Sequence, residues 1–276
     1  TLNKLTVGHL APISINPNQS FNGLIEVYSN SNLQLNNAGT LAADVKISGL
    51  GGKLEVLDNM TFSGSLQQVA LHEGFELKIS SGKSMNYSGD EFEIGSHTFK
   101  LTGGGNFNNS NHLILDDPSS VLSITDSTKI SRLQVDDSGT LDGLKITGSN
   151  TNSTGNLVGN LLLNKSFSVS SDKEWTVGEM SVGSAITFTS DKNLLVEKLT
   201  LSGAADLSLG SEDIIFSVTD PAVVGNSQKL QNGSGSYNFI GGLTLSTGGE
   251  ILTQGQQISG SIDLKGGQVS IKKDTV

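Results

Sequence analysis

Cysteine is absent from this sequence of 276 residues, which excludes disulfide bonds, zinc–thiolate sites and a cysteine nucleophile. Arginine is almost absent as well, because Arg132 is the single one. Acidic residues number 27 against 17 lysines and arginines, so the formal net charge at pH 7 is −10. Binding to nucleic acids or to anionic lipid depends on clustered Lys and Arg. We therefore expect no nucleic-acid partner.

Long hydrophobic runs and helical patterns are also missing. No apolar run approaches the ~20 residues that a membrane-spanning helix requires, so we expect no membrane insertion by this segment. No apolar i, i+3, i+4, i+7 pattern persists along the chain, which argues against a helical fold. Charged residues make up only 16% of the chain, which is unlike a disordered polyelectrolyte.

What the sequence does contain is a short apolar–x–apolar triplet that recurs along its whole length. The spacing between related triplets is 19 to 23 residues. Counted by their first residues, the triplets fall in five series: 5, 25 and 45; 13, 33 and 54; 77, 99, 122 and 144; 92, 113 and 133; and 167, 186 and 207. Gly, Asn, Asp and Ser separate the triplets and supply turns.

The triplets predict a stack of short strands. Side chains alternate across a strand, so the two apolar residues of a triplet share one face. Strands this short form no independent sheet, but each can pair in parallel with its equivalent one period away. The sequence therefore predicts an all-β fold, a single-stranded parallel β-helix (β-solenoid) with rungs of ~20–23 residues, as one domain over residues 1–276. A β-sandwich is the structural alternative, because it also has short alternating strands.

Two further features bear on this fold. Residues 33–41 (LQLNNAGTL) and 133–141 (LQVDDSGTL) match over a distance of 100 residues, which we interpret as five periods of 20 and as duplication. The period is least regular at 148–165 and 217–236, which are rich in Gly, Asn and Ser, and we expect loops there that bulge from the rungs.

Four aspartates are the strongest candidate site. Asp116 and Asp117 follow one triplet, and Asp136 and Asp137 follow another 20 residues later. Neighbouring rungs of a solenoid are ~4.8 Å apart, so these carboxylates are expected to stack. Stacked carboxylates repel each other unless they are solvated at turns or share a cation such as Ca²⁺. Calcium is thus the metal that the pattern allows, while solvated turn positions and a glycosidase pair are the alternatives.

Other candidate residues give weaker signals. Trp175 occupies an inward triplet position, where core packing is favoured over a sugar-binding platform. Thr187 and Thr189 would both point outward, as in ice-binding arrays, but this pair does not recur at the rung period. The four histidines share no metal-ligand spacing. We therefore predict no catalytic residues and no resident cofactor.

The triplets, the 33–41 and 133–141 repeats, the lack of cysteine, the acidic charge and the Ser/Asn/Gly enrichment together resemble bacterial cell-surface β-helix proteins. Autotransporter passengers and adhesins of the filamentous-haemagglutinin type are examples. The resemblance covers nearly the whole chain and is one of composition and architecture. It implies an extracellular location and a segment of a larger surface protein.

The resemblance also implies a function. We expect a non-enzymatic structural or adhesive β-solenoid that acts as a rigid rod or as an assembly and attachment module. Its expected partners are further copies of itself or a surface ligand, either glycan or protein. The alternatives are a polysaccharide-degrading or tail-spike-like β-helix enzyme, and a glycan- or ice-binding module.

Overall fold

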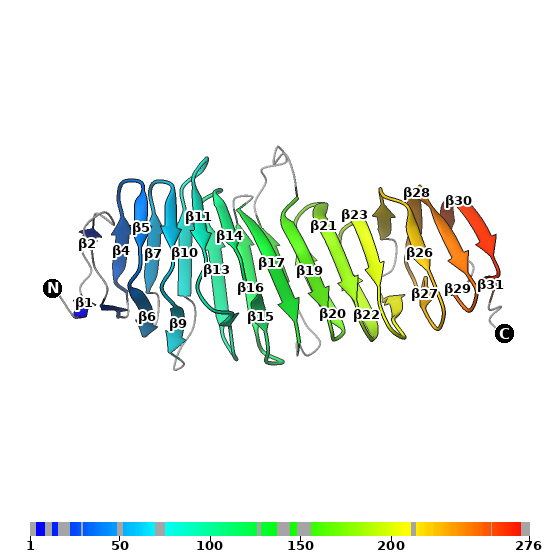
Figure 1. The fold of residues 1–276 in the computed structure, drawn as a ribbon, viewed down its shortest axis with the longest axis horizontal. Helices are drawn as coiled ribbons and strands as arrows, with labels where there is room; N and C mark the ends of the chain where they lie inside the picture. Colours follow the sequence, from blue (N-terminus) through cyan, green and yellow to red (C-terminus); the bar gives the residue numbers. More distant parts are fainter. Residues whose placement is uncertain are drawn as a thin grey trace. The chain divides into compact units, whose positions relative to one another are not determined.

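The computed structural model describes residues 4–8, 13–15, 23–28, 30–48, 52–69, 75–125, 128–136, 144–147, 156–210, 214–254 and 256–271. It divides into two compact units. Unit 1 comprises Thr1–Leu133 and Lys145–Ser153, and unit 2 comprises Gln134–Leu144 and Thr154–Val276. In each unit successive strands pair in parallel and form a β-solenoid (Figure 1), with rungs of about 21 residues, which confirms the predicted fold class. The extent of the domain, 1–276, stays a prediction.

Unit 1 has three walls, named here A, B and C, and on the rungs that begin with β3, β6 and β9 the chain visits them in the order A, B, C. Wall A contains β1 (Lys4–Val7), β3 (Leu24–Val27), β6 (Asp44–Ser48) and β9 (Leu66–Val69). Wall B contains β2 (Ile13–Ile15), β4 (Asn32–Leu35), β7 (Lys53–Val56), β10 (Phe75–Ile79), β13 (Thr98–Thr102) and β16 (Val121–Thr125). Wall C contains β5 (Gly39–Leu41), β8 (Met60–Phe62), β11 (Ser84–Tyr87), β14 (Asn106–Asn109) and β17 (Lys129–Val135).

Three strands complete this part of the chain. After β11 and β14 come β12 (Phe92–Glu93) and β15 (Leu113–Leu115), which pair with each other, and β15 also pairs with β17. β18 (Leu144–Thr147), like β17, contains residues of both units. The part of the chain that is described contains no helix, and hence none that could cross a bilayer.

Unit 2 is built from one flat wall and one bent wall. The flat wall contains β20 (Phe167–Ser171), β22 (Ala185–Ser190), β24 (Asp206–Leu209), β27 (Lys229–Gln231), β29 (Glu250–Thr253) and β31 (Gln268–Ile271). The bent wall contains β19 (Val158–Leu163), β21 (Trp175–Val182), β23 (Leu194–Leu201), β25 (Ile215–Val218), β26 (Ala222–Val224), β28 (Ser236–Ser246) and β30 (Ile258–Lys265).

The burial pattern of the long strands shows where they bend. In β21 the buried residues are 175, 177, 180 and 182, so two inward pairs are separated by the outward Gly178 and Glu179. Two consecutive outward residues turn the strand from one side of the tube to the next. A Cβ at Gly178 would lie 2.5 Å from the carbonyl oxygen of Gly159 on the adjacent rung, so the bend requires glycine at this position.

The apolar triplets point inward and form the core. On wall C of unit 1, Phe62, Tyr87 and Phe107 stack from rung to rung, with ring centroids 5.5 and 5.8 Å apart. In unit 2, Trp175 is 2% exposed and packs against Phe188 at 6.2 Å, which confirms its predicted place in the core. These ladders bury one large side chain per rung and leave the polar residue of each triplet outside.

Register was predicted well near the start of the chain and less well later. Ile13 pairs with Leu33, and Leu33 with Leu54, as the series 13, 33 and 54 predicts. Two predicted steps were wrong, however: Leu77 pairs with Leu101 instead of residue 99, and Phe167 pairs with Phe188 instead of residue 186. A shift of two residues keeps every side chain on its face, so the triplet alone cannot exclude it.

The five-period interpretation of the long repeat was also wrong. Leu33 belongs to β4 on wall B, whereas Leu133 belongs to β17 on wall C, so the two copies start on different walls. The predicted loops needed correction as well. Segment 148–165 contains β19, and segment 217–236 contains β26, β27 and the end of β25. In 217–236 the Gly, Asn and Ser residues fall largely in short turns between these strands and form no long loop. Residues 148–155 lie outside the described residues.

A matched pair of substitutions on β22 tests the inward–outward alternation. Phe188 is 0% exposed and contacts Trp175 and Phe216, while its neighbour Thr187 is exposed. We expect Phe188→Ala to lower the stability of unit 2 by about 3–5 kcal/mol, because it leaves a cavity in the ladder. Thr187→Ala should change it by less than about 0.5 kcal/mol. Chemical denaturation followed by tryptophan fluorescence measures both, and equal effects of the two substitutions would contradict the alternation.

Candidate functional site

The predicted aspartates lie at the ends of strands, where the backbone ladder stops. Asp116 and Asp117 follow β15 in unit 1, and Asp136 follows β17 in unit 2. Asp137 lies outside the described residues. Because the two pairs belong to different units, each is described by the bonds that it makes within its own unit.

Each described aspartate takes part in holding its turn. The Gly95 backbone N–H donates to Asp116 Oδ1 over 2.8 Å, which links two neighbouring rungs. Asp117 Oδ1 accepts from the Ser119 backbone N–H at 2.8 Å, the geometry of an aspartate turn. Asp136 accepts from Asn164 Nδ2 and from Gln134 Nε2, both at 2.7 Å. Each of these carboxylates therefore has a hydrogen-bonding role in its turn.

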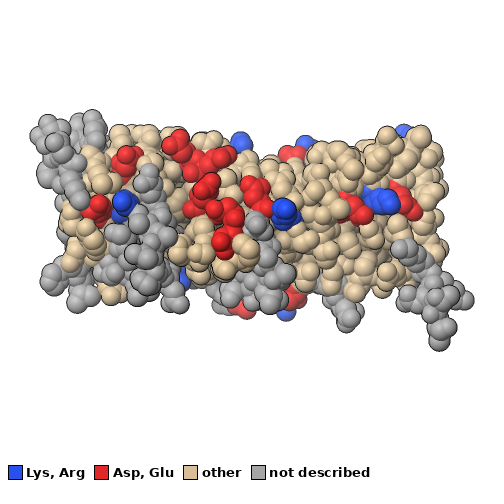
Figure 2. All heavy atoms as spheres, turned by 90° about the horizontal axis from the view of Figure 1, so that it is seen from below, with Lys and Arg blue, Asp and Glu red and all other residues tan. Residues whose placement is uncertain are grey.

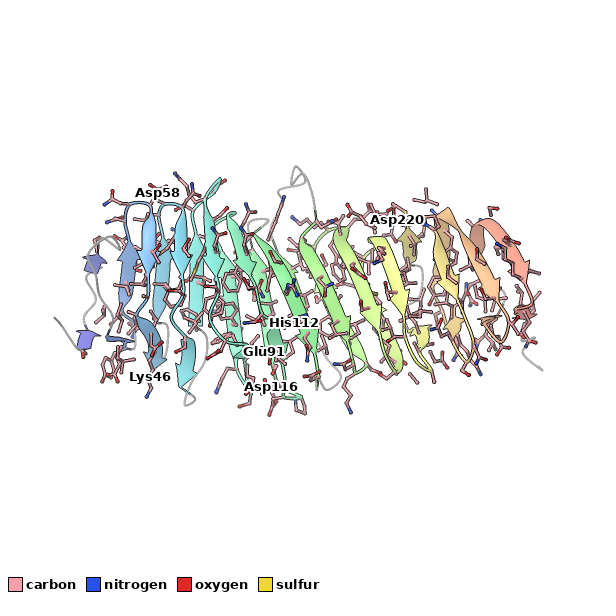
Figure 3. All side chains as sticks on the ribbon, in the orientation of Figure 1. Lys46, Asp58, Glu91, His112, Asp116 and Asp220 are labelled. Atoms are coloured by element: carbon pink, nitrogen blue, oxygen red, sulfur yellow. The ribbon has the colours of Figure 1, made fainter. Side chains whose placement is uncertain are left out.

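The first aspartate pair belongs to a wider acidic face of unit 1, defined here as Asp90, Glu91, Glu93, Asp116 and Asp117. Figure 2 shows acidic side chains gathered over the region of β12 and β15, and Glu91, His112 and Asp116 are labelled in that region in Figure 3. The Phe92 N–H donates to the His112 carbonyl oxygen at 3.2 Å, so Glu91 and His112 stand on adjacent rungs. A concentration of carboxylates of this kind attracts cations and repels acidic partners.

Calcium binding by the four aspartates stays a prediction. Within the described ranges, no three His, Asp or Glu side chains form a group that could hold a metal ion. Carboxylate oxygens are nevertheless the ligands that Ca²⁺ takes, and the acidic face offers several of them.

Side-chain oxygens that bridge rungs are the feature that sequence reasoning missed. In both units an Asp or Asn accepts a backbone N–H from the neighbouring rung where strands give way to turns. Besides Asp116, the pairs are Asp44 with Ser65, Asn59 with Ser84, Asn109 with Ser131, Asp191 with Ser171 and Asn193 with Ile215, at 2.7–3.2 Å. The sequence signal was the enrichment of Asn and Asp immediately before and after the triplets.

Asn109 shows how complete such a bridge can be. Its side chain is buried, at 3% exposure. Its Nδ2 donates to the carbonyl oxygens of Asn111 and Arg132 at 2.8 and 2.7 Å, and its Oδ1 accepts from the N–H groups of Ser131 and Arg132. All four hydrogen-bonding positions of the amide are used, so this side chain joins β14 to β17 as a backbone ladder would.

A polar column on the outer surface of wall B contains the most perturbed carboxyl group. Gln34, Glu55 and Lys78 occupy one register position on β4, β7 and β10. Lys78 Nζ donates to Glu55 Oε1 at 2.7 Å, and Gln34 and Asn32 donate to Oε2 at 2.8 and 3.1 Å. Glu55 is only 7% exposed although it points away from the core, because its neighbours on adjacent rungs cover it.

The electrostatics of Glu55 follow from this column. Burial by itself raises the pKa of its carboxyl group. The hydrogen bonds oppose burial, with that of Lys78 contributing most, and they lower the pKa to about 2 from an ordinary value of 4.5. In unit 2 a smaller example is Glu179, whose pKa is lowered by hydrogen bonds from Lys198 at 3.0 Å and from Thr200 at 2.9 Å.

Comparison of the chain with protein-family models, with curated proteins and with solved structures gave no match. The β-solenoid therefore rests on the geometry of the two units themselves. Membership of an autotransporter or adhesin family stays a prediction.

Asp116 provides a test that separates turn bonding from calcium binding. We expect Asp116→Ala to lower stability by about 1 kcal/mol, because the Gly95 N–H loses its acceptor. Asp116→Asn should stay close to wild type, since an amide oxygen can accept the same bond. Thermal unfolding of all three proteins is measured with and without calcium. A calcium-dependent rise in Tm that only Asp116 confers would show that cation binding, and not the turn, is its main role.

Glu55 makes stability depend on pH in a defined window. Because folding lowers its pKa, its contribution is present above pH 4.5 and is lost as the pH falls from 4.5 towards 2. We expect Glu55→Gln to cost about 1–3 kcal/mol at pH 7 and the difference from wild type to vanish near the acid end. Glu93→Gln, at an exposed position of β12, is the control and should cost little. Urea unfolding at several pH values measures the free energy of unfolding of each protein. A difference between wild type and Glu55→Gln that does not change with pH would contradict the charged role of Glu55.

Proposed function

We propose that this protein is a non-enzymatic structural or adhesive module of a bacterial cell surface, which acts by stiffness and by association with other molecules. The proposal takes its extracellular location from the resemblance in composition and architecture. The partners it assigns are further copies of the chain or a glycan or protein ligand at a surface, with no nucleic acid among them. It assigns no resident cofactor.

The observation that carries the proposal is the use made of polar side chains outside the core. Successive rungs are joined by backbone ladders, and at the turns by Asp and Asn oxygens such as those of Asp116 and Asn109. On the outer face of wall B, the Glu55 column joins three consecutive rungs. Bonds directed along the stacking axis resist bending and extension of a unit, which supports a mechanical role.

A stiff solenoid also presents an ordered outer surface. Outward residues of neighbouring rungs repeat at the spacing of parallel strands, ~4.8 Å. On β11 and β14, for example, Asn86 and Asn108 are paired and hydrogen-bonded across rungs at 2.9 Å. Polar groups at fixed spacing suit attachment to repetitive surfaces such as polysaccharides, which supports an adhesive role beside the structural one.

The test combines a catalytic assay with an adhesion assay on the same purified chain. The protein is incubated with a panel of neutral and acidic polysaccharides, and reducing ends are measured. We expect none above a heat-unfolded control. Beads coated with the protein should cluster or adhere to polysaccharide-coated or bacterial surfaces more than beads coated with an unrelated acidic protein. Release of reducing ends by the native protein would favour the polysaccharide-degrading alternative, and beads that neither cluster nor adhere would contradict the proposal.

A further inference from the structure

The outer surface of wall C in unit 1 is covered by uncharged polar side chains. On β8, β11 and β14 the inward residues are buried, and the residues that alternate with them point outward. These outward residues form three columns on three neighbouring rungs, named here the neutral grid: Asn59, Ser84 and Asn106; Thr61, Asn86 and Asn108; Ser63, Ser88 and Ser110. Every member is Asn, Ser or Thr, so the neutral grid offers hydrogen-bond donors and acceptors without any charge.

Strand register gives the neutral grid a regular spacing. Thr61 pairs with Asn86, and Asn86 pairs with Asn108. The backbone ladder extends to the serine column, because the Ser88 and Ser110 N–H groups each donate to the preceding rung at 2.9 Å. Neighbouring strands lie ~4.8 Å apart, and alternate residues of one strand lie roughly 6.6 Å apart. The polar groups therefore repeat in two directions.

Hydrogen bonds between rungs hold several of these side chains in place. Asn108 Nδ2 donates to Asn86 Oδ1 at 2.9 Å, and Asn106 Nδ2 donates to Ser84 Oγ at 3.3 Å. An amide has two N–H groups and an oxygen with two lone pairs, so each of these amides keeps positions for a further partner. A ligand on this surface would meet side chains that are already ordered and would lose less conformational entropy on binding.

The same three rungs have charged side chains on wall B. The outward residues there include Lys53 and Glu55 on β7, Glu76 and Lys78 on β10, and Lys100 on β13. Ion pairs join Lys78 to Glu55 at 2.7 Å and Lys53 to Glu76 at 3.3 Å. Neutrality is thus a property of the wall C surface and not of these rungs in general. Since charges on a surface select partners by their charge, a surface without them suits a neutral partner.

We propose that the neutral grid is the surface by which this protein attaches to a neutral polysaccharide. Sugar hydroxyl groups donate and accept hydrogen bonds, as the amides and hydroxyls of the neutral grid do. A polysaccharide also repeats these groups at regular intervals along its length. Ice presents a regular array too, but the members of the neutral grid differ in length from Ser to Asn and form no array of identical groups. The inference rests on the proposed adhesive function and names its surface and its class of ligand.

Retention on insoluble polymers tests the class of ligand with the wild-type chain alone. Cellulose, chitin and starch granules are the neutral probes, and a polygalacturonate gel is the acidic one. We expect retention on a neutral polymer, none on polygalacturonate, and equal retention at low and high salt, because the neutral grid has no charge for salt to screen. Loss of retention at high salt, or retention on polygalacturonate alone, would overturn the proposal.

A pair of double variants tests the surface. Asn86→Ala/Asn108→Ala removes the two exposed amides of the central column, and we expect retention to fall at least about tenfold as their hydrogen bonds to the polymer are lost. The matched control is Thr187→Ala/Ser208→Ala, which truncates a register pair of outward residues on β22 and β24 in unit 2 and should bind like wild type. Thermal unfolding verifies that both variants fold. Equal losses in the two variants would contradict the assignment of the neutral grid.

The outcomes separate this inference from the proposed function. Full retention of Asn86→Ala/Asn108→Ala would place attachment on another surface and would leave the adhesive function standing. A wild type that inhibits ice recrystallisation, or whose beads still cluster, but that binds no neutral polymer would likewise overturn the inference alone. Release of reducing ends from the polymers would count against the proposed function instead.

Discussion

Parallel hydrogen bonding between successive rungs is the interaction on which every other property of this protein depends. The strands are too short to form a sheet alone, and only the stack supplies each with neighbours on both sides. Once the rungs pair, inward residues at the same register position form apolar columns, as in the column from Leu33 through Leu54 to Leu77. The hydrophobic core is therefore a consequence of register, and a rung that lost its register would lose its core contacts at the same time.

The same dependence explains the composition. At the turns the backbone cannot continue its ladder, and oxygens of Asp and Asn accept the N–H groups that would otherwise lack partners. Asp116 accepts such an N–H with a carboxylate oxygen and Asn109 with an amide oxygen. Neither a charge nor one particular residue type is therefore needed at every turn. An acidic surface then arises in part from residues that were placed for bonding, and the acidic face of unit 1 contains two such aspartates.

Much of this architecture could be predicted from the sequence, and the limits have physical causes. Alternation made the inward positions readable, and Leu33 lies opposite Leu54 as the period requires. The alternation of apolar and polar residues does not distinguish registers that differ by two residues. For this reason the sequence predicted residue 99 as the partner of Leu77, which in fact pairs with Leu101. The candidate aspartates were found by their position after triplets, but their hydrogen-bond partners 20 or more residues away were not. Glu55 escaped notice because its burial comes from three rungs, and no single stretch of sequence contains them.

The bends of unit 2 have a consequence for how such a chain can change. Two outward residues suffice to turn β21 through its corner, whereas the same corner of β28 takes three, and the pairing resumes beyond it in each case. Corners thus absorb differences in length that the walls could not tolerate. Inserted residues can accumulate at the corners without disturbing the apolar columns inside. One scaffold can therefore carry many different surface loops at its corners while its core stays the same.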